Sequence, residues 1–121
     1  MTITVNAHDI VAQRPIEVSM TDSSGSHVEL ILLIGMLPPI RHAFAFTEGT
    51  ITVPLPDLKP GIYKCTFVVQ ALKTKATPNR MYNVALDVNG HSIARCQGEI
   101  PSDRNNDFGF GDFKLTVAEA A

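Results

Sequence analysis

The chain has 121 residues, of which 45% are hydrophobic, 18% charged and 7% aromatic, with a formal net charge of −2. This length fits a single domain, residues 1–121, and the apolar content excludes a disordered chain. The near-neutral charge argues against binding to nucleic acid or to an anionic membrane, and the two Cys are too few for a disulfide scaffold and are expected to stay reduced and buried.

Apolar and polar residues alternate along most of the chain, as in β-strands, and helical periodicity is almost absent. Pro15 interrupts the strand before it, which suits an edge strand that kinks or changes sheet, because proline has no N–H group. The predicted strands, in chain order, cover residues 2–6, 16–20, 27–36, 41–47, 50–55, 61–72, 82–88, 91–96 and 113–117. About eight or nine strands predict an all-β domain, a two-sheet antiparallel β-sandwich, with a small barrel as the alternative.

The clearest local signal is Asn89-Gly90, which stands between two alternating runs. Asn-Gly is the preferred sequence of a type I′ two-residue turn, in which both residues need positive φ. The turn predicts a hairpin in which Leu86 lies opposite Ile93. The polar, glycine-rich segment 98–111 that follows is expected to be a loop.

Residues 58–63 read Leu-Lys-Pro-Gly-Ile-Tyr, and Tyr63 stands two residues before Cys65. This pattern resembles the tyrosine corner of immunoglobulin-like and fibronectin-like Greek-key sandwiches, over roughly residues 1–72. The resemblance implies a hydrogen bond from the Tyr63 hydroxyl to the backbone near Asp57 or Leu58. The chain lacks the core Trp and the partner Cys of true immunoglobulin domains, so a jelly-roll variant stays open. The resemblance concerns the fold and does not carry a function.

The segment 27–37 differs from the other strands because it is apolar on both faces from Leu30 onward. A sandwich strand turns one face to the core, so Ile31 and Leu33 need a second cover. The cover is either a segment of the same chain, such as residues 108–110, or another subunit or partner. The predicted interface comprises Leu30, Ile31, Leu32, Leu33, Ile34, Met36 and Leu37.

Asp103, Asn105 and Asp107 place oxygen-bearing side chains at alternate positions of one segment, as a hard cation such as calcium requires. A glycine at the seventh position of the segment and Lys114 at the twelfth exclude an EF-hand. The segment is therefore either an irregular calcium loop or a solvated turn. No other cofactor is expected.

No pattern typical of an enzyme is present: the chain lacks a nucleophile elbow, a phosphate-binding glycine loop and paired metal-binding histidines. Lys73, Lys75 and Arg80 form a small basic cluster, which is expected to be a solvated loop. The four histidines are scattered singly, at His8, His27, His42 and His91. We therefore expect no enzymatic activity.

These observations favour a structural or interaction module that packs against copies of itself or within a larger assembly. Small sandwiches of this kind resemble, at the level of the fold, accessory or decoration proteins of virus and phage particles. The alternative is a carbohydrate- or ligand-binding module, with calcium as an aid and Phe108, Phe110 and Phe113 near the site. The first residues show no basic segment followed by an apolar core, so we expect cytoplasmic synthesis without a signal peptide. The resemblance to decoration proteins implies association with a virion.

Overall fold

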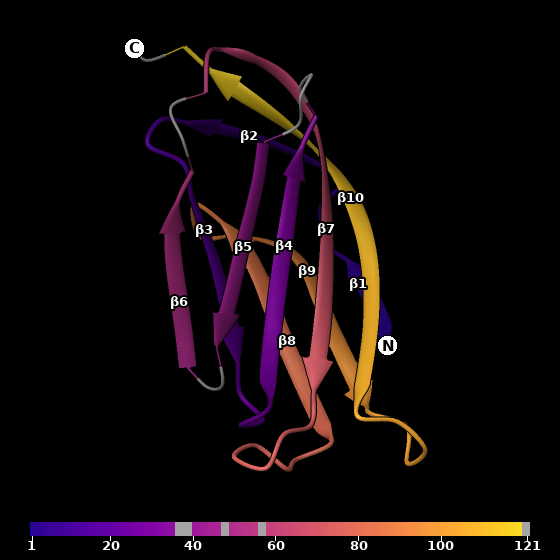
Figure 1. Ribbon diagram of the computed structural model, residues 1–121. Coiled ribbons are helices and arrows are strands. Elements are labelled where there is room, and N and C mark those ends of the chain that lie inside the picture. The colour runs from indigo at the N-terminus through magenta and orange to yellow at the C-terminus, as the bar shows by residue number, and fades with distance from the viewer. Residues whose placement is uncertain (36–39, 47–48, 56–57, 120–121) are drawn as a thin grey trace.

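The computed structural model describes residues 1–35, 40–46, 49–55 and 58–119, and for residues 40–46, 49–51 and 53 it covers the backbone alone. These residues form ten β-strands in two facing sheets of five (Figure 1). The predicted all-β, two-sheet sandwich is therefore confirmed. In this part of the chain, no helix is long and apolar enough to span a membrane.

The first sheet is antiparallel throughout. It contains β1 (Thr2–Val5), β3 (Glu17–Asp22), β6 (Gly49–Pro54), β8 (Met81–Val88) and β9 (His91–Glu99). Its strand order is β1-β9-β8-β3-β6.

The second sheet is mixed, because one of its strand pairs is parallel. It contains β2 (Asp9–Gln13), β4 (His27–Ile34), β5 (Ile40–Phe46), β7 (Gly61–Leu72) and β10 (Asn106–Ala118), in the order β2-β10-β7-β4-β5. β2 runs parallel to β10, with Asp9 opposite Lys114, so the expectation of a wholly antiparallel sandwich needs this correction. The chain leaves the second sheet after β2 and enters the first at β3, so the change of sheet predicted at Pro15 is confirmed.

The core lies between the sheets and is built by the strict alternation of the strands. In β4, Val28, Leu30, Leu32 and Ile34 are at most 1% exposed, whereas the residues between them are only partly buried. β7 and β8 alternate in the same way, because successive side chains of a strand point to opposite faces. Each fully buried aliphatic side chain stabilises the fold by about 1.5–3 kcal/mol.

β10 begins at Asn106, inside the segment 98–111 that was expected to be a loop. Glycine and polar residues there suggested a turn, but Gly109 and Gly111 are inward-facing positions of a strand that pairs with β7 along its length. A side chain at either position would collide with Ile3 or Phe67. The expectation was wrong because close packing, and not a turn, requires these glycines.

The hairpin between β8 and β9 has the predicted turn, with φ of 48° at Asn89 and 79° at Gly90. The predicted pairing of Leu86 with Ile93 is wrong, since a register shift next to Leu86 places Ala94 opposite it. Ile93 and Ala94 are consequently both buried, as the extra residue of a β-bulge allows.

Tyr63 near the start of β7 donates its hydroxyl hydrogen to the backbone carbonyl of Lys59, at 2.7 Å. The hydrogen bond expected from the tyrosine-corner pattern is present, and its acceptor is the backbone carbonyl of the residue that follows Leu58. Asp57 lies outside the described residues.

Candidate interaction surface

The outward face of the second sheet carries a row of apolar side chains across three neighbouring strands. Phe110 of β10 lies opposite Val68 of β7, and Val68 lies opposite Ile31 of β4. Phe108, two residues before Phe110, points to the same face because side chains alternate along a strand. Phe108 is 57% exposed and Phe110 is 68% exposed, while Ile31, Leu33 and Val68 are partly exposed. We call Ile31, Leu33, Val68, Phe108 and Phe110 the outer patch.

The outer patch bears on the alternative in which residues 108–110 cover Ile31 and Leu33. Phe108 and Phe110 belong to the same sheet as Ile31, two strands away, and point outward with it. They therefore enlarge the exposed apolar surface and do not shield it. In Figure 1, β5, β4, β7 and β10 of the second sheet lie in front of β8 and β9, and the lower half of β10 lies at the right-hand border.

Only some residues of the predicted interface lie on the outward face of β4. Ile31 and Leu33 point outward, as expected. Leu30, Leu32 and Ile34 point into the core, so their assignment to an interface is wrong. The apolar run had hidden the alternation, because both faces of the strand carry aliphatic residues. Met36 and Leu37 lie outside the described residues.

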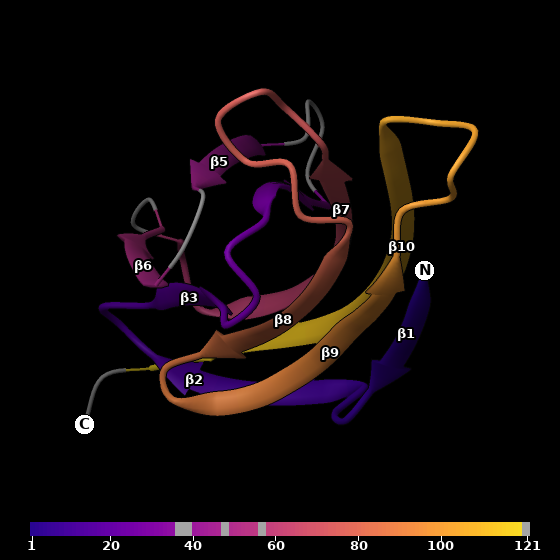
Figure 2. The same cartoon turned by 90° about the horizontal axis from the view of Figure 1, so that it is seen from below.

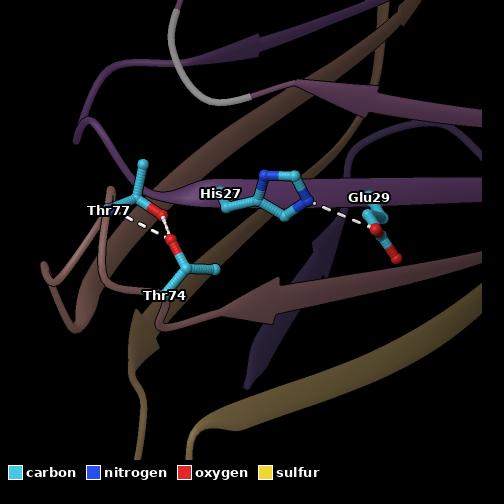
Figure 3. Close-up of polar contacts among 4 residues, drawn as sticks. All are labelled: His27, Glu29, Thr74 and Thr77. Atoms are coloured by element: carbon cyan, nitrogen blue, oxygen red, sulfur yellow. Dashed lines mark hydrogen bonds and ion pairs between the residues drawn. The ribbon is translucent and has the colours of Figure 1, made fainter.

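The side chains around the outer patch are polar and make hydrogen bonds or ion pairs with one another. Thr66 donates to Asp112 at 2.7 Å between Oγ1 and Oδ1. Nε2 of His27 lies 3.2 Å from Oε1 of Glu29, near the loop in which the hydroxyls of Thr74 and Thr77 share a hydrogen bond (Figure 3). At the other end of the sheet, Nζ of Lys114 lies 3.4 Å from Oδ1 of Asp9. The patch is therefore an apolar centre inside a polar frame.

The predicted calcium ligands are divided between the surface and the interior. Asp103 and Asn105 are exposed in the loop between β9 and β10, which projects from the sandwich in Figure 2. Asp107 is buried; its Oδ2 atom lies 2.9 Å from the α-amino nitrogen of Met1 and accepts a hydrogen bond from the Tyr82 hydroxyl. Because this carboxylate bonds to internal groups, the predicted calcium loop lacks one of its three ligands.

The environment of Asp107 favours its charged form. Burial by itself raises the pKa of this carboxyl, but hydrogen bonds from Tyr82, from the α-amino group and from the N–H of Phe108 outweigh burial and hold the pKa below its usual value. The pKa of Tyr82 is raised by burial and by its bond to Asp107. Asp107 and Tyr82 thus tie the start of β10 to β8.

The described cysteines and histidines lie at separate places in the fold. Cys65 and Cys96 are free and buried, as predicted, and burial raises their pKa to about 12 and about 11. His8 and His91 are exposed, and for His42 only the backbone is described. Among the described residues, no three His, Cys, Asp or Glu side chains gather into a group that could hold a metal.

The basic cluster predicted from the sequence lies beside the loop that precedes β10. Arg80 donates to the carbonyls of Pro101 and Arg104, both at 2.8 Å, so its guanidinium is held to the loop before β10. The N–H of Lys73 donates to the carbonyl of Asn105 in the same loop, at 2.7 Å, and Lys73 and Lys75 line an open hollow with Thr74, Pro78 and Asn105. Phe113, counted with the other phenylalanines for sugar binding, is 4% exposed and belongs to the core.

The outer patch was missed in part because Phe108 and Phe110 had been placed in a loop. The sequence does contain a signal for it. Phe108 and Phe110 alternate in step with the charged residues Asp112 and Lys114, which mark the outward face of a strand. Comparison with protein-family models, curated proteins and solved structures found no match for this chain.

Proposed function

We propose that this protein is a non-enzymatic interaction module that binds another protein through the outer patch. The observation that carries the proposal is the pair Phe108 and Phe110, exposed side by side on one sheet face next to Val68 and Ile31. An apolar patch in contact with water marks an interaction site, and aromatic side chains are enriched at the centres of interfaces.

The polar frame of the patch supports the same proposal. Protein–protein interfaces have an apolar centre and a polar rim, and the rim contributes specificity. Glu29 and Asp112 flank the apolar row on either side, with Lys64 exposed beyond Asp112 on the neighbouring strand. A partner would therefore meet charges of both signs around an apolar centre.

We further propose that the module is a subunit or accessory protein of a larger assembly, with a virus or phage particle as its setting. The small sandwich, its near-neutral charge and its apolar outer face support this setting. For the fold we propose an immunoglobulin-like Greek-key arrangement, supported by the hydrogen bond between Tyr63 and Lys59.

The test is the size of the particle that contains the chain when it is isolated from its native source under mild conditions. We expect the native chain to elute well above its own mass of 13.1 kDa. Replacing both phenylalanines, Phe108→Ser and Phe110→Ser, should release it from that particle. A native chain that elutes as a monomer would contradict the proposal, and so would a double variant that stays in the particle.

Val11→Ser is the matched control for this experiment. Val11 is 67% exposed on β2 of the same sheet, and it does not belong to the outer patch. The control removes a similarly exposed apolar side chain, so an effect of merely placing a hydroxyl group on this sheet would appear in both variants. We expect the control to remain in the particle.

A further inference from the structure

The first half of β10 has an open edge. β2 pairs with β10 only from Lys114 to Ala118. Before β2, the chain belongs to the first sheet, where the N–H groups of Asn6 and Ala7 both donate to the carbonyl of Ile93. Among the described strands, none therefore pairs with residues 106–112 on the side away from β7, and Figure 1 shows this half of β10 at the border of its sheet.

The direction of the backbone groups at this edge follows from the residue at its end. The N–H of Lys114 donates to the carbonyl of His8 at 2.8 Å and so points away from β7. Backbone groups alternate in direction along a strand, so the N–H and C=O groups of Phe110 and Asp112 point the same way. Those of Gly109 and Gly111 point toward β7. Phe110 and Asp112 thus present backbone groups that another strand could bind.

The centre of this edge, residues 108–111, lacks the features that usually prevent strands from pairing, and the charged residues Asp107 and Asp112 lie on either side of it. Natural proteins protect open edges with charged side chains, prolines or bulges. Residues 108–111 read Phe-Gly-Phe-Gly and contain none of these. The same residues carry the two most exposed aromatic side chains among the described residues. The open backbone and the exposed rings therefore lie in one short segment.

We infer that β10 of a second copy of this chain binds this edge, antiparallel and across a two-fold axis at Gly109. The inference rests on the proposed function and names the partner. In this register, residues 106–112 of one copy pair with residues 112–106 of the other. Phe108 lies opposite Phe110 of the second copy, and Asn106 lies opposite Asp112.

The segment is self-complementary in this register except at the N–H of Phe108, which already donates to the Asp107 side chain. The N–H of Phe110 meets the C=O of Phe108 in the second copy, and the N–H of Asp112 meets the C=O of Asn106, each twice by symmetry. Two cross-strand phenylalanine pairs form on the outer face, an arrangement that stabilises sheets. No like charges oppose one another. The paired segment also has natural limits: β2 occupies the edge of β10 from Lys114 onward, and β10 begins at Asn106.

The experiment measures the solution mass of the purified chain by sedimentation velocity, from about 1 µM to about 1 mM. We expect the mass to rise from 13.1 kDa toward twice that value. Phe110→Pro removes an N–H that points to the open side, so the ladder with β7 remains. The dimer dissociation constant of this variant should be at least about tenfold higher than that of the wild type. The control Val11→Ser should have the dissociation constant of the wild type.

Amide hydrogen exchange of the wild-type chain tests the same contact without a substitution. The amides of Phe110 and Asp112 should exchange at least about tenfold more slowly at the high concentration than at the low one. The amide of Thr66, in the middle of the sheet, should not change with concentration. If the proline variant fails to fold, this measurement decides the question.

A chain that stays monomeric over the whole range would overturn the inference. So would a dimer in which the Phe110 and Asp112 amides exchange as fast as in the monomer. The purified chain could also be monomeric while the native chain occurs in a large particle. That result would overturn the inference that the partner is a second copy. The proposed function would then stand, with a different protein as the partner.

Discussion

A Cβ atom on Gly111 would lie only 2.5 Å from Cζ of Phe67, so the ring occupies the space that a side chain at position 111 would need. Gly111 faces the interior of the sandwich from β10 and Phe67 faces it from β7, the neighbouring strand. Phe67 is fully buried, and its ring centroid lies 6.4 Å from that of Phe113. The ring is therefore held on several sides and has little room to move away.

Gly111→Ala should destabilise the protein by about 1–3 kcal/mol, because overpacking a filled core displaces side chains and backbone. The free energy of unfolding in urea measures the loss. The double variant Gly111→Ala with Phe67→Leu should recover part of it, since a smaller side chain leaves space for the new methyl group. An alanine variant as stable as the wild type would contradict the close contact.

Asp107→Asn should make the stability of the protein less dependent on pH in the acid range. The folded-state pKa of Asp107 lies below its unfolded value, so its charged form stabilises the fold above the unfolded pKa of about 3.9, and this contribution is lost as the pH falls through the folded pKa. The variant should lose about 1–3 kcal/mol at pH 7 and progressively less toward pH 3.

Asp103→Asn is the control for this experiment, because Asp103 is exposed in the loop that precedes β10. Urea unfolding midpoints between pH 7 and pH 3 would be compared for the two variants. The unfolding midpoint of the Asp107 variant should approach that of the wild type as the pH falls. The midpoint of the Asp103 variant should equal that of the wild type at every pH. Equal curves for both variants would contradict the role of the Asp107–Tyr82 contact.

The fold was predictable from sequence where local chemistry determines it. Alternation identified most strands, Asn89-Gly90 identified the turn, and Pro15 identified the change of sheet. The first half of β10 was missed because glycine has two roles: it permits turns, and it permits close packing in a strand. Only the contacts of Gly109 with Ile3 and of Gly111 with Phe67 distinguish them.

The candidate surface was only half predictable, because it combines strands that are distant in sequence. Ile31 was recognised from the run of aliphatic residues in β4. Its neighbours Val68 and Phe110 become visible only from the registers of β4 with β7 and of β7 with β10. Asp107 was misjudged for a similar reason, since its partner Tyr82 lies on another sheet.

The two thiols should be unreactive in the folded protein. Thiol reagents attack the thiolate, and burial raises the pKa of Cys65 to about 12 and that of Cys96 to about 11. At about pH 8 a coloured disulfide reagent should find almost no thiol in the native chain and both in denaturant. The variant Val11→Cys supplies an exposed thiol as a positive control. Rapid native labelling of Cys65 or Cys96 would contradict their burial.

The Asn89 side chain should stabilise the fold beyond its role in the turn, because it joins the hairpin to the crossover from β2 to β3. Its Oδ1 accepts from the N–H of Glu17 at 2.8 Å, and its Nδ2 donates to the carbonyl of Gln13 at 3.3 Å. Asn89→Gly keeps the positive φ but loses both bonds, each worth about 0.5–1.5 kcal/mol and nearer the lower figure at this exposed site.

Asn89→Ala should lower the free energy of unfolding by about 1 kcal/mol more than Asn89→Gly does, since alanine also strains the backbone at a φ of 48°. Thermal and urea unfolding should therefore rank the wild type above Asn89→Gly, and Asn89→Gly above Asn89→Ala. A glycine variant equal to the wild type would show that the two side-chain bonds contribute nothing. An alanine variant equal to the glycine variant would show that residue 89 does not need the left-handed conformation.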